Sequence, residues 1–236
     1  MIHITGDTHG KRDWGKIFMA CKHGHIAKGD YVIICGDFGG VWYGNGKDDE
    51  LLNRYAKSPF TILFIDGNHE NFDKLYEYPV EDWNGGKVHK IRDNVLHLMR
   101  GQIFTIEDKT FFTLGGGTSI DKEWRLQYER ENSSYKKPCK IWWEQEIPTL
   151  GELGMATVNL LKHRDKVDYI ITHTMGNKFM KQTLDFVKEE SILNEYLDTV
   201  MQTVEYKRWF CGHFHVDRDY KEQKVSMLYD RIITLE

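Results

Sequence analysis

Short apolar runs recur along this 236-residue sequence, and a small polar cluster follows each of the strongest ones. In the first third of the chain, these runs alternate with two stretches that predict helices, the second of which, residues 47–57, is charged and rich in leucine. This alternation is typical of a βαβαβ unit whose parallel strands are buried on both faces. Later runs repeat the arrangement, so we expect an α/β fold. The predicted strands of this kind are residues 2–5, 31–35, 61–65, 167–172 and 207–211.

The remaining segments complete a provisional element map. Three short runs broken by turn residues, at 95–99, 102–106 and 110–114, predict an antiparallel meander. The end of the chain predicts closing antiparallel strands. They lie near 216–220, 224–229 and 231–235, and the predicted helices are 12–21, 47–57, 149–163 and, in one or two pieces, 178–202.

Composition narrows the classes of protein to which the chain can belong. With 40% hydrophobic and 29% charged residues the chain is not disordered, and its length suits a single domain over 1–236. The net charge of −4 argues against a protein that coats duplex nucleic acid through a basic face. No apolar run is long enough to span a membrane, and the first residues do not resemble a signal peptide. Four scattered cysteines fit a reducing compartment, so we expect a cytoplasmic protein.

The polar clusters lie where the chemistry of such folds is usually found. Ligands of α/β proteins gather outside the carboxyl ends of parallel strands, and this chain returns there five times. Glycines beside several of the clusters allow a sharp turn from strand to loop. The clusters are Asp7-Thr8-His9, Gly36-Asp37, Gly67-Asn68-His69-Glu70, His173 and Gly212-His213-Phe214-His215.

The clusters combine carboxylate, amide oxygen and imidazole groups, which suits Mn²⁺, Fe or Zn²⁺, with Mn²⁺ as the first choice. Seven such groups are too many for one tetrahedral ion. They suit two divalent ions that share a carboxylate and lie roughly 3.5–4 Å apart. The candidate ligands are Asp7, His9, Asp37, Asn68, His173, His213 and His215.

In this order and spacing, the clusters resemble the motifs of the calcineurin-like metallophosphoesterases, from Asp7 to His215. The resemblance implies a four-layer α/β/β/α sandwich with two mixed sheets, which hydrolyses phosphoesters through a metal-bound hydroxide. It also implies that Asp37 bridges the two ions and that His69 is catalytic, as a general acid or a transition-state stabiliser, without being a ligand. One ion would be held by Asp7, His9 and His215, and the other by Asn68, His173 and His213.

The sequence departs from the Ser/Thr protein phosphatase branch of that family. The branch's GDxVDRG element reads Gly-Asp-Phe-Gly-Gly-Val-Trp over residues 36–42, so Gly40 replaces the aspartate expected to orient His69. The following arginine is missing, and Asp66 stands where that branch has another arginine. Protein phosphatase activity is therefore not expected, and the group that orients His69 is left open. Glu70 is interpreted as a solvated residue at the start of a helix.

Residues 118–148 are rich in aromatic and charged side chains and predict a lid or an insertion. Trp142, Trp143 and Arg125 are candidates to stack on a base and contact a phosphate. The alternative is that the aromatic rings pack this segment onto the domain, which is their usual use.

Small phosphorylated or nucleotide substrates are the expected substrate class, and duplex nucleic acid is disfavoured by the net charge. A nuclease of the same family is one alternative. A non-catalytic binding module on the same fold is another, although it would need broken ligands and all of the candidates are present. The sequence leaves the oligomeric state open.

Overall fold

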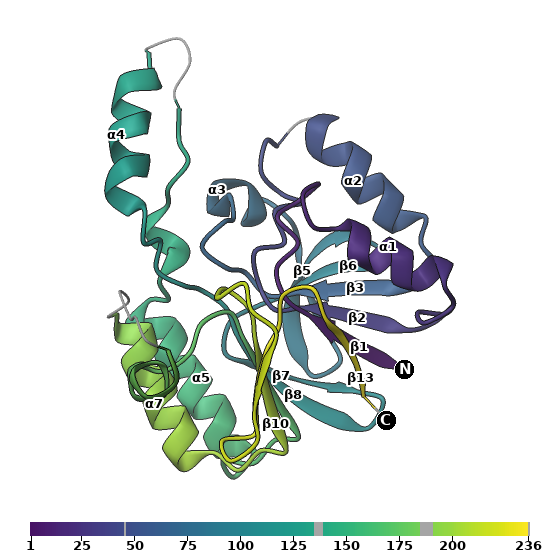
Figure 1. The fold of residues 1–236 in the computed structure, drawn as a ribbon, viewed down its shortest axis with the longest axis vertical. Coiled ribbons are helices and arrows are strands. Elements are labelled where there is room, and N and C mark those ends of the chain that lie inside the picture. The colour runs from purple at the N-terminus through teal and green to yellow at the C-terminus, as the bar shows by residue number, and fades with distance from the viewer. Residues whose placement is uncertain (45, 135–138, 185–190, 236) are drawn as a thin grey trace.

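The computed structural model describes residues 1–44, 46–134, 139–184 and 191–235, and its strands form two sheets (Figure 1). In the first sheet, the pairs that join β1, β2, β3 and β6 are parallel, and the outer pairs are antiparallel. Its order is β13 (Ile232–Leu235), β1 (Ile2–Thr5), β2 (Tyr31–Ile34), β3 (Thr61–Phe64), β6 (Val95–Leu98), β5 (Gly86–Arg92) and β4 (Val80–Trp83).

The second sheet is also mixed. Its central pairs, which join β12, β10, β9 and β8, are parallel, and the pair at each edge is antiparallel. Its order is β11 (Arg218–Tyr220), β12 (Val225–Met227), β10 (Arg208–Cys211), β9 (Tyr169–Thr172), β8 (Lys109–Leu114) and β7 (Gln102–Ile106).

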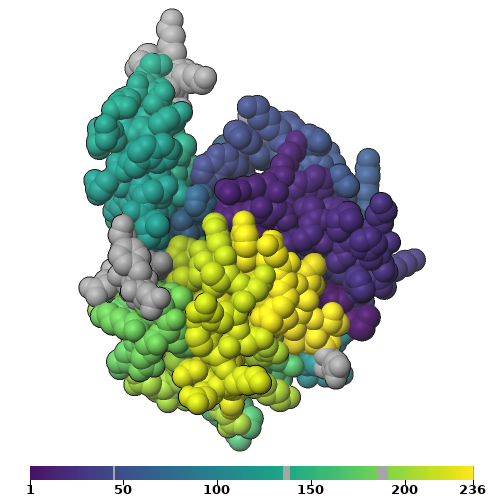
Figure 2. Space-filling view, in the orientation of Figure 1, coloured from purple at the N-terminus to yellow at the C-terminus, as the bar shows by residue number. Residues whose placement is uncertain are grey.

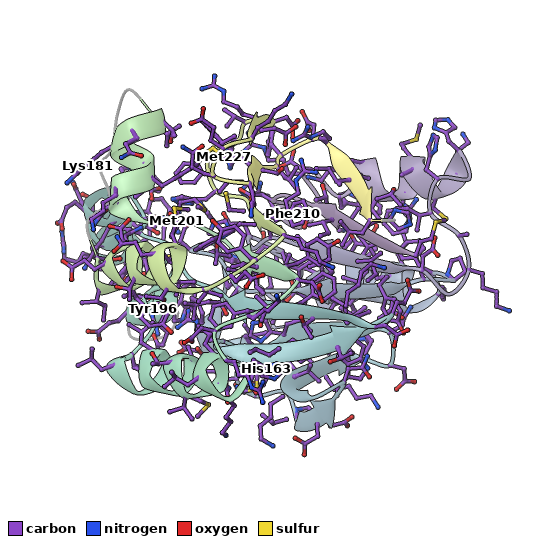
Figure 3. All side chains as sticks on the ribbon, turned by 90° about the horizontal axis from the view of Figure 1, so that it is seen from below. His163, Lys181, Tyr196, Met201, Phe210 and Met227 are labelled. Atoms are coloured by element: carbon purple, nitrogen blue, oxygen red, sulfur yellow. The ribbon has the colours of Figure 1, made fainter. Side chains whose placement is uncertain are left out.

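Helices cover the outer face of each sheet, which gives four layers (Figure 1). One apolar cluster lies between each sheet and its helices. A third lies between the two sheets and contains side chains such as Ile33 and Phe210, the second of which is labelled in Figure 3. The predicted α/β/β/α sandwich with two mixed sheets is thus confirmed. The covering helices are α1 (Gly15–Lys22) and α2 (Gly46–Ala56) on the first sheet and α5 (Leu150–Lys162), α6 (Asn177–Thr183) and α7 (Ile192–Thr203) on the second.

The central strands are apolar at successive positions because both of their faces are buried. In β2, Val32 and Ile34 pack beneath the helices, whereas Ile33 between them faces the second sheet. Successive side chains of a strand point to opposite faces, so a strand between two apolar layers shows no polar alternation. The continuous runs in the sequence thus reflect strands in the middle of the sandwich.

The predicted meander over 95–114 is only half right. The strands β7 and β8 do form an antiparallel hairpin, but β6 belongs to the other sheet, where it pairs in parallel with β3. The connection at Arg100 and Gly101 carries the chain from one sheet to the other, a long-range change that a local pattern does not show. Strands β4 and β5 were not predicted. The closing strands do make antiparallel pairs, β11 with β12 and β13 with β1, but β12 also pairs in parallel with β10 on its other side.

The predicted helices agree more closely with the structure. The segments 12–21, 47–57 and 149–163 correspond to α1, α2 and α5, and α5 begins with a capping box between Thr149 and Glu152. The segment 178–202 contains two helices, α6 and α7, and its residues 185–190 lie outside the described part of the chain. None of the described helices is long and apolar enough to cross a membrane.

The aromatic-rich segment contains α4 (Lys122–Asn132), which projects from the body of the molecule (Figure 1). A short 3₁₀ turn, Glu144–Glu146, follows it, and residues 135–138 of the predicted lid lie outside the described residues. A hollow separates α4 from the α2 segment in Figure 2. We refer to residues 121–134 and 139–143 as the α4 arm.

Candidate functional site

All of the predicted ligands lie on loops that follow strands, at one end of the two sheets. The loops after β1, β2 and β3 belong to the first sheet, and those after β9 and β10 belong to the second. Three groups of side chains come close enough for each group to hold an ion. They are Asp7 with His9 and His215; Asp7 with Asp37 and His173; and His9 with Asp37 and His69.

Two further predicted ligands join these groups through His173. The Oδ1 atom of Asn68 lies 3.1 Å from Nε2 of His173, and Nδ1 of His213 lies 3.2 Å from the same nitrogen. The backbone N–H of His213 donates to Oδ1 of Asp7 at 2.9 Å, which ties the loop after β10 to the loop after β1. The structure therefore brings all seven predicted ligands into one constellation.

The carboxylate of Asp37 lies at the middle of this constellation. Its Oδ2 is 3.4 Å from Nε2 of His9, and its Oδ1 is 3.3 Å from Nε2 of His173. Burial opposes ionisation of Asp37, but His173 and His9 hold the pKa of this carboxyl well below its usual range. Burial likewise disfavours the charged ring of His173, yet Asp37 and Asp7 raise its pKa to about 10. The two buried carboxylates therefore favour positively charged groups beside them.

The donor set fits divalent cations. Atom Oδ2 of Asp7 is buried and accepts no hydrogen bond of suitable geometry from the described residues, although Nε2 of His215 lies 3.0 Å away. A buried carboxylate oxygen without a donor is costly unless a cation satisfies it. Together with imidazole nitrogens and an amide oxygen, it offers the mixed ligand set that Mn²⁺, Fe and Zn²⁺ accept.

The loops are strained where they carry these side chains. The backbone φ angle lies between +43° and +70° at His9, Asp37, His213 and His215, a region that residues other than glycine rarely adopt. Such conformations persist where the surroundings impose them, and they concentrate at functional sites. Four such residues, on three different loops, therefore gather in this one cluster.

Glycines let the loops approach the carboxylates. A Cβ atom on Gly67 would lie 2.1 Å from Oδ1 of Asp37, and one on Gly212 would lie 2.2 Å from Oδ1 of Asp7. Contacts this short are not possible for real side chains. Only glycine at these two positions lets the backbone pass so close to the buried acids.

Outer hydrogen bonds orient the candidate ligands, and the sequence analysis missed their donors and acceptors. Nδ1 of His9 lies 2.8 Å from a carboxylate oxygen of Asp13, and Nδ1 of His173 lies 2.8 Å from the carbonyl oxygen of Cys35. In both rings the remaining nitrogen, Nε2, faces the acids. Such partners fix the orientation of metal-binding histidines. The spacing of four residues between His9 and Asp13 was the one local signal for the first of these pairs.

A buried chain of polar groups orients Asn68. Its amide nitrogen donates to Oγ of Ser119 at 3.3 Å, and this hydroxyl donates to Oε2 of Glu146 at 2.5 Å. The backbone N–H of Ser119 donates to the other oxygen of Glu146 at 3.1 Å. Because its nitrogen is engaged by Ser119, the amide presents its oxygen to His173.

A family model for calcineurin-like phosphoesterases matches residues 1–217. The chain belongs to this family. The clusters described above are its candidate metal-binding groups. No curated protein matches the chain.

Two solved structures are similar to this phosphoesterase in overall arrangement. A putative 5′-nucleotidase from Staphylococcus aureus, solved in complex with alpha-ketoglutarate, is 12% identical, with a TM-score of 0.48. The match covers 100% of this chain but 51% of that one, so the chain spans about half of that protein's length. A phosphopantetheinyl hydrolase from Mycobacterium tuberculosis is also 12% identical, with a TM-score of 0.42 over 97% of this chain and 87% of that one.

Within the phosphoesterase site, His69 has an unexpected neighbour. A terminal guanidinium nitrogen of Arg125 lies 2.8 Å from Nε2 of His69 and 3.2 Å from Nδ1. A guanidinium has no acceptor, so the closer ring nitrogen is the acceptor. Burial lowers the pKa of His69 to about 4; Arg125 and His9 add to this effect and Asp37 opposes it. The ring is therefore neutral at pH 7.

The surroundings of Glu70 and Gly40 differ from what the sequence suggested. Glu70 is fully buried rather than solvated, and it accepts hydrogen bonds from the backbone N–H groups of Phe38 at 2.7 Å and Gly39 at 3.4 Å. Burial beside Asp37 raises the pKa of Glu70 well above its usual value. The carboxyl group thus anchors the loop after β2. A Cβ atom on Gly40 would lie 2.4 Å from the Phe38 ring, which explains why no larger residue stands there.

The other residues of the α4 segment occupy different environments. Trp143 is buried, and its ring lies edge-on to that of Trp42 with the centroids 5.4 Å apart. Trp142 is half-buried, with the Lys122 ammonium 4.2 Å from its ring centroid. Trp42 lines a cavity of about 680 Å³ that opens beside His9 and His69.

Proposed function

We propose that this protein hydrolyses small phosphoesters with two divalent ions, Mn²⁺ being the expected native metal and Fe or Zn²⁺ the alternatives. The observation that carries the proposal is the convergence of seven candidate ligands around the buried carboxylates of Asp7 and Asp37, one of whose oxygens has no adequate donor among the described residues. When bound, such ions supply Lewis-acid charge to the phosphoryl oxygens and lower the pKa of a water.

The proposed assignment of ligands follows the contacts. Asp7, His9 and His215 form one group, and Asn68, His173 and His213 gather on the other side of Asp37. Asp37 touches a histidine of each group and is the residue placed to serve both ions. His9, Asp37 and His69 are also close enough together to share an ion, so the exclusion of His69 from the ligand set requires a test.

We assign His69 to the phosphoryl group or the leaving oxygen. Its backbone N–H donates to Oδ1 of Asp37 at 2.8 Å, which fixes the main chain beside the proposed bridge. Because its ring is neutral, it serves better as a hydrogen-bond donor that stabilises developing charge than as a charged acid at neutral pH.

The cavity beside His9 and His69 supports a small substrate. Its volume of about 680 Å³ falls in the range of small-molecule sites. Basic side chains in its lining outnumber the acidic ones, although one of them, Lys11, pairs with Glu50. Trp42 and Tyr43 supply aromatic surface. This combination suits a phosphorylated compound with a flat group, such as a nucleotide.

The test is a metal-dependence experiment on the purified full chain. Phosphomonoesters, phosphodiesters and dinucleotides are offered to protein stripped by a chelator and then reloaded with Mn²⁺. We expect stripping to abolish hydrolysis of an activated aryl phosphate and Mn²⁺ to restore it. Full activity in protein that elemental analysis shows to be free of metal would overturn the proposal.

A further inference from the structure

Arg125 is the one buried residue among those of α4, a helix that is otherwise largely exposed. Its exposed fraction is 4%, whereas the adjacent Trp124 is 59% exposed. Arginines are seldom buried without a partner or a task, and large aromatic residues are usually the ones that a helix buries. In α4 the arginine is buried and the tryptophan is exposed, so the helix is placed such that its guanidinium points into the protein.

The guanidinium is held in a fixed orientation. Its Nε donates to Oδ1 of Asp121 at 2.8 Å, and a terminal nitrogen donates to the carbonyl oxygen of Ile141 at 3.4 Å. The other terminal nitrogen points at His69. Asp121 is 44% exposed on its side chain, so water screens this ion pair and the carboxylate does not cancel the charge that faces His69.

The α4 arm itself is attached to the body of the molecule. Carboxylate oxygen Oε1 of Glu129 accepts the backbone N–H groups of Ile141 at 2.6 Å and Trp142 at 2.7 Å, which joins the two sides of the arm. At its base, the Lys140 ammonium pairs at 2.7 Å with Asp73 of α3 (Phe72–Leu75). These contacts fix the arm next to the loop that carries His69.

We propose that Arg125 is a substrate-binding residue that grips the phosphoryl group, and that the α4 arm exists to deliver it. The inference rests on the proposed function. An imidazole ring carries no negative charge, so the contact with His69 leaves the buried positive charge of the guanidinium uncompensated at the place we assign to the phosphoryl group. When substrate binds, a phosphoryl oxygen replaces His69 as the acceptor of the hydrogen bond that the Arg125 N–H donates in the free protein. The planar donor fork of arginine matches phosphate oxygens, and charge-assisted hydrogen bonds of this kind are the strong ones.

The test measures binding of inorganic phosphate to the Mn²⁺-loaded full chain by calorimetry, alongside kcat and KM for an aryl phosphate. Arg125→Gln removes the charge, Arg125→Lys keeps it without the fork, and Arg130→Gln changes an exposed arginine of the same helix. We expect Arg125→Gln to raise the Kd for phosphate by roughly 10–100-fold, as a lost charged hydrogen bond predicts. The lysine variant should fall between, and the Arg130 variant should match the unmodified protein. Metal content should be unchanged in all three.

The outcomes separate this inference from the function on which it rests. If the unmodified protein, loaded with metal, hydrolyses no phosphoester, the proposed function fails. If it is active and Arg125→Gln binds phosphate as tightly as before while kcat falls, Arg125 only positions His69 and the inference is wrong. If the glutamine variant does not fold, the lysine variant decides: an unchanged Kd and an unchanged KM for the aryl phosphate overturn the inference.

Discussion

The carboxylate of Asp37 lies 3.3 Å from the imidazole of His173, although the two residues follow strands of different sheets. Its other oxygen faces His9, so one side chain links the loops of both sheets. Bringing the ends of two sheets together places a buried carboxylate between two sets of nitrogen donors. The sandwich therefore makes the candidate dinuclear site a property of the interface between its sheets.

Replacing Asp37 with Asn should drop the metal content from two ions toward one per chain and nearly abolish turnover. The amide keeps the shape but removes the negative charge that screens the repulsion between two cations. Elemental analysis of purified variants at saturating Mn²⁺ gives the stoichiometry, and circular dichroism checks the fold. Asp49→Asn, on the exposed side of α2, is the control. Two ions in Asp37→Asn, or a single ion in the unmodified protein, would contradict the bridging role.

Replacing His69 with Ala should leave both ions in place and lower the rate by roughly 10²–10⁴-fold, the usual range for proton-transfer and hydrogen-bond assistance. The loss should be smaller for aryl phosphates with good leaving groups, because these need less stabilisation of the departing oxygen. The measurement is kcat across a series of leaving groups, with His25→Ala as an exposed control. An equal loss across the series would remove the role at the leaving group, and a lost ion would make His69 a ligand.

The positions of the proposed ligands could be predicted from the sequence because each depends on local information. A buried strand shows as a continuous apolar run, and the polar residue after it marks the strand's carboxyl end, as at Asp7, Asp37 and His173. Parallel strands of one sheet end at one edge, so local reading already groups Asp7 with Asp37. The four-layer arrangement followed from the family resemblance rather than from these patterns.

What could not be predicted depends on contacts between distant segments. Arg125 meets His69 across 56 positions, and Ser119 meets Asn68 across 51. Neither pair has a periodicity that would reveal it. The burial of Glu70 likewise depends on the loop after β2 folding over it, whereas its place at a predicted helix start suggested exposure. The crossing between sheets near Arg100 was missed because the adjacent runs look alike in sequence.

Trp42 and Trp143 should differ in how they affect substrates. Trp42 lines the cavity, so Trp42→Ala should raise KM for a nucleotide substrate more than KM for a small aryl phosphate. Trp143 lies buried behind it, so Trp143→Ala should lower the free energy of unfolding by about 3–5 kcal/mol and change both KM values together. Steady-state kinetics and thermal unfolding separate these effects. A selective nucleotide defect in Trp143→Ala without loss of stability would instead make this ring a direct substrate contact, as the sequence suggested.

Asp30 should make the free energy of unfolding fall as the solution becomes acidic. Its carboxylate accepts the Ala27 N–H at 2.7 Å and lies 3.0 Å from Nε2 of His3, which joins the starts of β1 and β2. Burial opposes ionisation, but these partners hold the pKa of Asp30 at about 2. Because this value lies below that of the unfolded chain, the stabilisation is full above about pH 4 and is lost as the pH falls through 2. Asp30→Asn should cost about 2 kcal/mol at pH 7 and progressively less in acid.

Denaturant unfolding of Asp30→Asn between pH 2 and 7 measures this difference. Asp93→Asn, at an exposed position, should show no such pH dependence. A destabilisation by Asp30→Asn that stays constant down to pH 2 would mean that packing, rather than the charge, accounts for the effect.

The hydroxyl of Ser119 should determine how well Asn68 serves as a ligand. In Ser119→Ala the amide of Asn68 loses the acceptor that fixes which of its ends faces His173, and Glu146 loses its shortest hydrogen bond. Loss of such an orienting partner typically lowers metal affinity by roughly 10–100-fold. We therefore expect the ion beside His173 to bind more weakly, with little change in the ion beside His215. The neighbouring Thr118→Val is the matched control, since this hydroxyl makes no hydrogen bond to any described residue. Titration of metal-free protein with Mn²⁺ resolves the two affinities. If both variants bind two ions as the unmodified protein does, the hydrogen-bond chain from Glu146 has no part in orienting Asn68.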